Sequence, residues 1–174
     1  MPELRILFLN YFTYLYSVKK NLARLLVSID KLESYIPHAA LRNESISKVN
    51  IAWQIDHSLN VLLSITKALK QSNPDQYKKR LNFRWLLLGS LSWFPRGKGK
   101  APKVVVPEGE ITESSLKKKV LEARKAIAEL ADFSKSSYFP HPLFGDLNLN
   151  QALKFMCIHT QHHLKICRDI LLTS

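Results

Sequence analysis

Two histidines one helical turn apart are the residues of this sequence best placed to do chemistry. His159 and His163 are separated by four positions, so on a helix both imidazoles leave the same face. Two ring nitrogens with this spacing can reach one metal ion at roughly 2.0–2.1 Å each. The pair shares its face with Met156, Cys167 and Ile170. This pattern predicts that both rings point into the interior, where an imidazole needs a bonding partner.

A third histidine, His57, lies in an earlier apolar stretch, one helical turn after Trp53. We predict that it completes the site as the third metal ligand. Three histidines without a fourth protein ligand leave a coordination position for water or substrate, which is typical of catalytic rather than structural sites. Facing helices of a bundle commonly contribute such ligands.

The individual histidines also have simpler interpretations. A lone histidine is more often a hydrogen-bonded residue than a ligand, and a helical His-x-x-x-His pair by itself is moderately specific for metal. His162 is the rival ligand, because it lies three positions after His159, although we expect it to face solvent. His38 is expected in an exposed turn. His141 could either line the mouth of the site or have a structural role in a loop.

Cysteine chemistry is the weaker interpretation. Cys157 and Cys167 are ten residues apart in one expected helix, a separation of roughly 15 Å, whereas a disulfide needs Cα atoms roughly 4.4–6.8 Å apart. The two therefore do not bridge each other, which favours a reducing cytoplasm. Cys167 is one turn beyond His163 and could approach the site, but small buried thiols are usually inert.

Apolar residues recur at three- and four-residue steps in four stretches, which predict helices over about residues 18–35, 47–71, 112–130 and 148–171. Ser47 is the expected N-cap of the second helix. About forty residues separate the second helix from the third, more than adjacent antiparallel helices need. We therefore predict an all-α four-helix bundle with a long crossover between helices 2 and 3. Within the crossover, residues 81–94 are expected to form a short capping helix.

The first seventeen residues are expected to form an N-terminal extension (1–17) that precedes the bundle domain (18–174). Residues 6–18 are apolar and aromatic, but they are too short for a membrane span of about 20 residues and lack the features of a signal peptide. We therefore expect no membrane insertion. Two alternatives stay open for the extension: additional helix that packs on the bundle, or disordered sequence upstream of the native start.

The net charge of +12 is unevenly distributed. Between Asp75 and Glu108 the chain has basic residues and no acidic ones. Such a segment could bind an anionic ligand, a nucleic acid or a membrane surface, or it could be a solvated basic loop. Nucleic acid is the less favoured partner, because no helix-turn-helix or other reading motif is present. The candidate residues for holding an anionic small molecule are Arg96, Lys98, Lys100 and Lys103.

Residues 53–58, Trp-Gln-Ile-Asp-His-Ser, and residues 159–164, His-Thr-Gln-His-His-Leu, resemble the DinB-like (YfiT-like) superfamily of metalloenzymes. Residues 94–107 and 141–145 look like an uncharacterised branch of it. The resemblance covers roughly residues 18–171. It implies a four-helix bundle with a long crossover and a mononuclear zinc, nickel or iron site on His57, His159 and His163. Characterised relatives include transferases and isomerases that use low-molecular-weight thiols, and some members have been called hydrolases.

The resemblance thus implies a metal-dependent enzyme, a thiol-dependent transferase or a hydrolase, with a small-molecule substrate. The residues alone do not identify a reaction. The alternatives are a non-catalytic bundle that is stabilised by a metal and a basic protein that binds nucleic acid or another anion through structural rather than metal-binding histidines. The oligomeric state is not fixed by the sequence, and a homodimer is one of the states that it allows.

Overall fold

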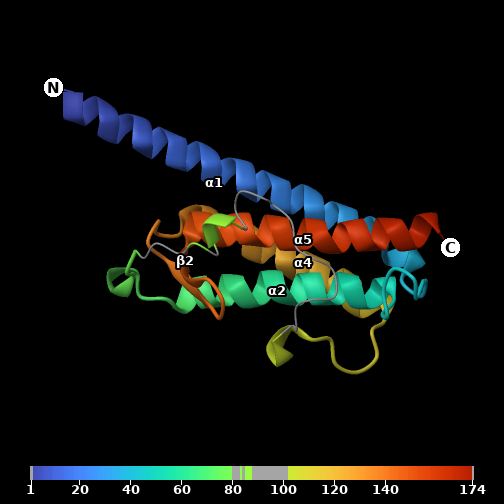
Figure 1. Cartoon of the computed structure of the whole chain (residues 1–174). Coiled ribbons are helices and arrows are strands. Elements are labelled where there is room, and N and C mark those ends of the chain that lie inside the picture. The colour runs from blue at the N-terminus through green and yellow to red at the C-terminus, as the bar shows by residue number, and fades with distance from the viewer. Residues whose placement is uncertain (1, 80–82, 84, 88–101, 174) are drawn as a thin grey trace.

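Four long α-helices dominate residues 2–79, 83, 85–87 and 102–173, which the computed structural model describes (Figure 1). They are α1 (Pro2–Ser34), α2 (Ile51–Gln71), α4 (Glu113–Glu129) and α5 (Leu149–Leu172). The predicted all-α bundle is confirmed, and the long crossover connects α2 to α4. Of the expected capping helix over residues 81–94, the described residues 83 and 85–87 are helical, and the others lie outside the described part of the chain.

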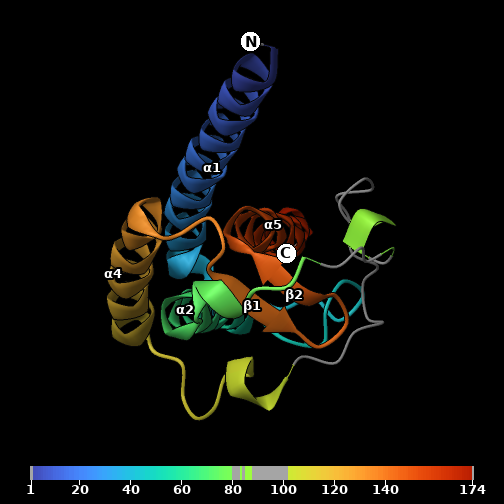
Figure 2. The ribbon, with the colours of Figure 1, turned by 90° about the vertical axis from the view of Figure 1, so that its left-hand side faces the viewer.

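The helices pack around one apolar core. α1 contacts α5 and α4, and α2 contacts the same two helices; Figure 2 shows α2 and α5 nearly end-on. Each helix contributes fully buried aliphatic side chains at helical spacing, because one stripe of each faces the core. Examples from the four helices in turn are Leu25, Ile29, Ile55, Leu59, Leu116, Ile127, Leu153 and Ile170.

Side-chain caps fix where three of the helices begin. Thr112 and Asn148 form capping boxes at the starts of α4 and α5, which confirms the two predicted starting positions. The prediction of Ser47 as the cap of α2 is wrong. Asn50 caps this helix instead and accepts from the backbone N–H of Trp53 at 3.0 Å. The N–H of Ile51 donates to the Leu41 carbonyl oxygen in the preceding loop. The helix therefore begins at Ile51.

Helix α1 begins sixteen residues before the predicted start at Val18, at Pro2. Residues 2–17 thus continue the same helix, and this end of α1 extends beyond the other helices (Figure 1). Tyr14 and Val18 pack on the core, whereas Phe8 and Phe12 are exposed. The domain boundary at 17/18 stays a prediction. Among the described residues, no helix has both the length and the apolar character that crossing a bilayer requires.

A β-hairpin, which the sequence pattern did not predict, precedes α5. Strands β1 (Tyr138–His141) and β2 (Gly145–Asn148) pair antiparallel, with His141 opposite Gly145. Each strand has four residues, so alternation is too short to register as a strand signal. Gly145 has φ +65°, a conformation that glycine adopts without steric cost. The hairpin packs against α2 and α5, which brings His141 towards the histidine-bearing face of α5.

Candidate metal centre

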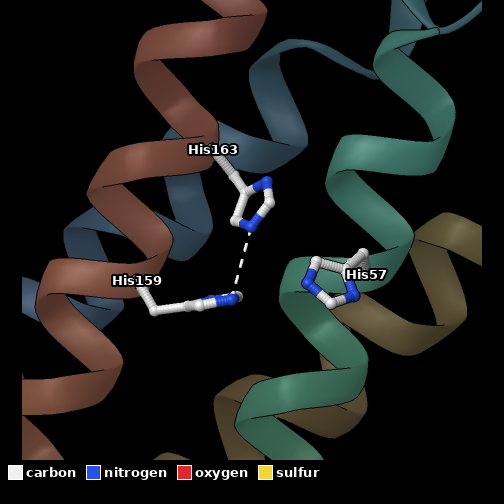
Figure 3. Close-up of side chains that lie close together, drawn as sticks. All are labelled: His57, His159 and His163. Carbon is white, nitrogen blue, oxygen red and sulfur yellow. Dashed lines mark hydrogen bonds between the residues drawn. The ribbon is translucent and has the colours of Figure 1, made fainter. Parts of the chain in front are cut away.

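His57 from α2 and the pair His159 and His163 from α5 converge in the bundle interior (Figure 3). One ligand atom from each ring lies within 4.8 Å of the other two. The ring centroid of His57 is 5.2 Å from that of His159 and 4.8 Å from that of His163. The structure thus brings together the three histidines that the sequence singled out, in a cluster that could hold a metal ion.

Two carbonyl-type oxygens determine where the protons of this cluster lie. The Nδ1–H of His57 donates to the Val105 carbonyl oxygen at 2.8 Å, and the Nδ1–H of His163 donates to Gln54 Oε1 at 2.6 Å. Both oxygens can only accept, so in the neutral rings Nε2 keeps its lone pair. Partners of this kind fix the tautomer and the orientation of metal-binding histidines.

One pair of nitrogens in the cluster has the spacing of two ligands on one ion. His163 Nε2 and His159 Nε2 are 3.3 Å apart. Two nitrogens at roughly 2.0–2.1 Å from a tetrahedral ion lie about 3.3 Å from each other. The same distance also allows a hydrogen bond, in which His159 must donate because the proton of His163 is on Nδ1. Either form requires the His163 ring to be neutral.

Burial keeps these rings neutral. The exposed fraction is 4% for His57 and 7% for His163, whereas the His159 residue is half-buried with a ring nitrogen turned into the cluster. Burial lowers the pKa of His57, lowers that of His163 well below its usual 6.5, and lowers that of His159 to about 3, with the neighbouring histidines adding to the last two shifts. A metal ion binds the deprotonated imidazole, so the cluster is in its ligand form at neutral pH.

Aromatic rings form the walls of the cluster. Trp53 stacks on His57 at a centroid distance of 4.8 Å, and Phe155 stacks on His159 at 5.9 Å. His141 packs edge-on against Phe155 at 4.7 Å. One aromatic ring therefore separates His141 from the cluster.

His141 is itself held in a defined state. Its Nδ1 accepts from the Leu143 N–H at 3.1 Å in the hairpin turn, so in the neutral ring the proton is on Nε2. Burial lowers its pKa to about 4. Of the two roles left open for His141, the structure thus shows a bond that stabilises the turn and a position beside the cluster.

The crossover also contributes to the cluster, which sequence reasoning missed. Val105 lies at the end of the 3-10 helix η3 (Lys103–Val105), which contacts α2. A backbone carbonyl has no sequence signal, so its bond to His57 could not be read from residue types. Gln54 was also missed as the partner of His163, although a polar residue one turn before His57 on an apolar helix was an available signal.

The four basic candidates for anion binding are only partly described. Lys103 is exposed in η3, two residues before the carbonyl that holds His57. Arg96, Lys98 and Lys100 lie outside the described residues. Binding of an anion by these four residues stays a prediction.

The other histidines and the cysteines lie outside the cluster. His162 is half-buried, with its ring edge-on to that of His163 at 5.1 Å, and His38 is exposed at the end of η1 (Ile36–His38). Cys157 and Cys167 are free and buried. Burial raises the pKa of these thiols to about 11 and about 12, which disfavours the thiolate that nucleophilic catalysis needs.

One ion pair lies directly beside the cluster. The carboxylate of Asp56, next to His57 in α2, is buried and pairs with Lys119 of α4. Asn60 donates to its other oxygen at 3.0 Å. The negative charge is thus compensated by α4, and its effect of raising the pKa of His57 is smaller than the opposite effect of burial.

Comparison with known proteins found a relative and a family, neither of which has an assigned function. The chain is 25% identical over 151 residues to the uncharacterized protein YuaE of Bacillus subtilis (strain 168), an alignment that covers 80% of this chain and 91% of YuaE. No solved structure matches it. Residues 81–169, which include His141, His159 and His163, match the family described as "Protein of unknown function (DUF1569)". Because this match covers just over half of the chain, the protein belongs to the DUF1569 family.

Proposed function

We propose that this protein is a metal-dependent enzyme of the DinB-like type, in which His57, His159 and His163 hold one divalent ion. The observation that carries the proposal is the set of Nδ1–H bonds to Val105 and Gln54. These bonds leave the Nε2 lone pairs of His57 and His163 for the interior of the cluster. In Figure 3 one nitrogen of the His57 ring faces the other two rings.

The proton count of the cluster favours a cation over hydrogen bonds alone. A neutral His159 has one ring proton, so its Nε2–H can satisfy the lone pair of His163 or that of His57, but not both. Satisfying both lone pairs by hydrogen bonds would need one more proton in the cluster, which would make one ring cationic. The lowered pKa values of all three histidines oppose this charge. A metal ion accepts lone pairs from all three rings, and the donor set of three imidazoles suits zinc, nickel and iron.

Three protein ligands leave a coordination position for a small molecule. A bound ion supplies Lewis acidity, which lowers the pKa of a water or thiol at that position. The protein's own part is to hold the rings and to position the substrate. We assign substrate positioning to Lys103, on the crossover beside the cluster, and to Arg96, Lys98 and Lys100, which would bind carboxylates of a low-molecular-weight thiol or its acceptor.

The reaction class that the resemblance implies is a transfer that depends on a low-molecular-weight thiol, or the hydrolysis of a small molecule. We place it in a reducing compartment such as the cytoplasm, because a low-molecular-weight thiol is available there and both cysteines of the chain are free.

Elemental analysis of protein purified without a polyhistidine tag tests the site. After supply of zinc, nickel and iron, the wild type should retain about one ion per chain, and His163→Ala should retain none. His38→Ala is the matched control, because His38 is exposed and outside the cluster, and it should bind metal as the wild type does. An empty wild-type protein under all three metals would refute the proposal.

Activity distinguishes an enzyme from a metal-stabilised bundle. The metal-loaded protein is screened for thiol transfer to electrophilic acceptors and for hydrolysis. Turnover that is lost in His163→Ala supports the enzyme. A metal-loaded protein that melts at lower temperature with chelator but turns over no substrate supports the structural alternative.

A further inference from the structure

The projecting end of α1 has a row of large exposed apolar side chains. Phe8, Leu9, Phe12 and Tyr16, called here the aromatic stripe, are 63%, 64%, 55% and 69% exposed. They follow one another at helical spacing and therefore share one face of the helix. The rings of Phe8 and Phe12 are in contact, with centroids 4.6 Å apart. Exposed apolar patches of this kind usually mark an interaction site.

The face opposite the aromatic stripe is already used. Val18 is buried in the core and Ser17 donates to Asn150 Oδ1 of α5 at 3.0 Å. The aromatic stripe therefore cannot turn inward without breaking the packing of α1 on the bundle. In Figure 1 this end of α1 extends away from the other helices, which leaves the stripe accessible to a large surface.

Cationic residues border this uncharged segment. Residues 6–18 include no charged side chain, Arg5 precedes them, and the exposed lysines Lys19 and Lys20 follow. Lys20 Nζ lies 5.9 Å from the ring centroid of Tyr16. Aromatic side chains next to lysines match the boundary between hydrocarbon and headgroups, where the ring is buried and the ammonium reaches the phosphate layer.

We propose that the aromatic stripe binds the surface of an anionic lipid bilayer, with Lys19 and Lys20 against the headgroups. The apolar side chains would enter the interface, and the net charge of +12 would draw the protein to negative lipids. The helix would lie at the surface and not cross it, in agreement with the absence of a spanning helix among the described residues.

Charge decides against the two other occupants. A second copy of this chain would bring another net charge of +12 and a second pair of lysines to the same face, which opposes pairing. A single-stranded nucleic acid would satisfy the charge, but it binds in grooves with stacking rings, whereas the stripe lies on a convex helix and includes Leu9. An anionic bilayer satisfies both the charge and the aliphatic surface.

Co-sedimentation of the full chain, without an N-terminal tag, with lipid vesicles tests the proposal. Binding is expected to vesicles of equal parts phosphatidylglycerol and phosphatidylcholine, weaker at high salt, and much weaker to phosphatidylcholine alone. Phe8→Ser/Phe12→Ser should lower the partition coefficient at least about tenfold. Lys19→Gln/Lys20→Gln should remove most of the preference for anionic lipid.

The matched control is Leu121→Ser/Leu172→Ser, which removes two exposed leucines from α4 and α5 and should bind as the wild type does. All variants change exposed residues, so each should melt close to the wild type. Absence of wild-type binding, or wild-type binding by Phe8→Ser/Phe12→Ser, would overturn the proposal. So would a dimer, or a complex with single-stranded RNA, that depends on Phe8 and Phe12 while vesicles stay unbound.

Discussion

The side chain of Gln54 accepts a 2.6 Å hydrogen bond from Nδ1–H of His163, and this bond links α2 to α5 at the cluster. The amide is itself oriented, because Gln54 Nε2 donates to Ser47 Oγ at 3.0 Å. The loop before α2 thus holds the far side of the amide whose oxygen faces the histidine. Gln54, which binds no metal in our proposal, therefore sets the tautomer of the ligand His163.

Replacing Gln54 should weaken metal binding without removing it. Gln54→Leu takes away the acceptor that orients His163, and loss of such a partner typically lowers metal affinity about 10- to 100-fold. Competition with a chromogenic chelator measures the change in affinity. Gln71→Leu, at the exposed end of the same helix, is the control and should bind as the wild type does. Equal affinity in both variants would show that the bond does not matter.

The sequence predicted the bundle because four helices have long apolar stripes, and it predicted His57, His159 and His163 because each lies on such a stripe. It missed contacts that depend on distant backbone. The carbonyl of Val105 reaches His57 across forty-eight positions of chain, and residue types contain no information on that path. The hairpin was missed because four-residue strands have almost no periodicity.

The starts of α1 and α2 also depend on contacts that the local sequence pattern does not reveal. Ser47 and Asn50 are both good N-caps, and only the loop that bonds the N–H of Ile51 selects between them. For α1 the apolar pattern of residues 6–18 is compatible with helix, but its aromatic side chains are exposed. Periodicity therefore shows that a helix forms and not which of its faces is buried.

Acid should destabilise the fold through His141. Its pKa is about 4 in the folded state and 6.5 as the ordinary value, so the unfolded chain binds a proton first as the pH falls. The free energy of unfolding therefore decreases below pH 6.5, by about 1–2 kcal/mol at pH 4 from this half-buried group once solvent screening is allowed for, and is independent of His141 above that range. Urea unfolding between pH 7 and pH 4 measures the slope.

His141→Phe should make that slope shallower, because the group that titrates is removed while an aromatic ring still fills the space beside Phe144 and Phe155. Leu143→Phe, at an exposed position between the two strands of the same hairpin, changes no titrating group and should leave the slope unchanged. An unaltered slope in His141→Phe would mean that other groups cause the acid sensitivity.

Removal of metal should lower the stability of the wild type only. When the free ion concentration is a hundred times its Kd, binding to the folded state raises the free energy of unfolding by about 2.7 kcal/mol. The unfolded chain gains nothing, because it has no preformed site. Thermal melting with and without chelator measures the effect. His159→Ala should melt at one temperature in both conditions, since it lacks a ligand. A chelator effect that persists in His159→Ala would place the ion elsewhere.

Breaking the ion pair beside the cluster should cost more than a surface pair does. Lys119→Met leaves the buried Asp56 carboxylate with the Asn60 amide alone, and an uncompensated buried charge destabilises by several kcal/mol. Because Lys119 is partly exposed, we expect a loss of about 2–3 kcal/mol in urea unfolding. Lys118→Met, at an exposed position of the same helix, should change stability by less than about 0.5 kcal/mol. The double variant Asp56→Leu/Lys119→Met removes the charge as well as its partner and should recover most of the loss. If it is no more stable than Lys119→Met alone, then the buried carboxylate is not the source of the cost.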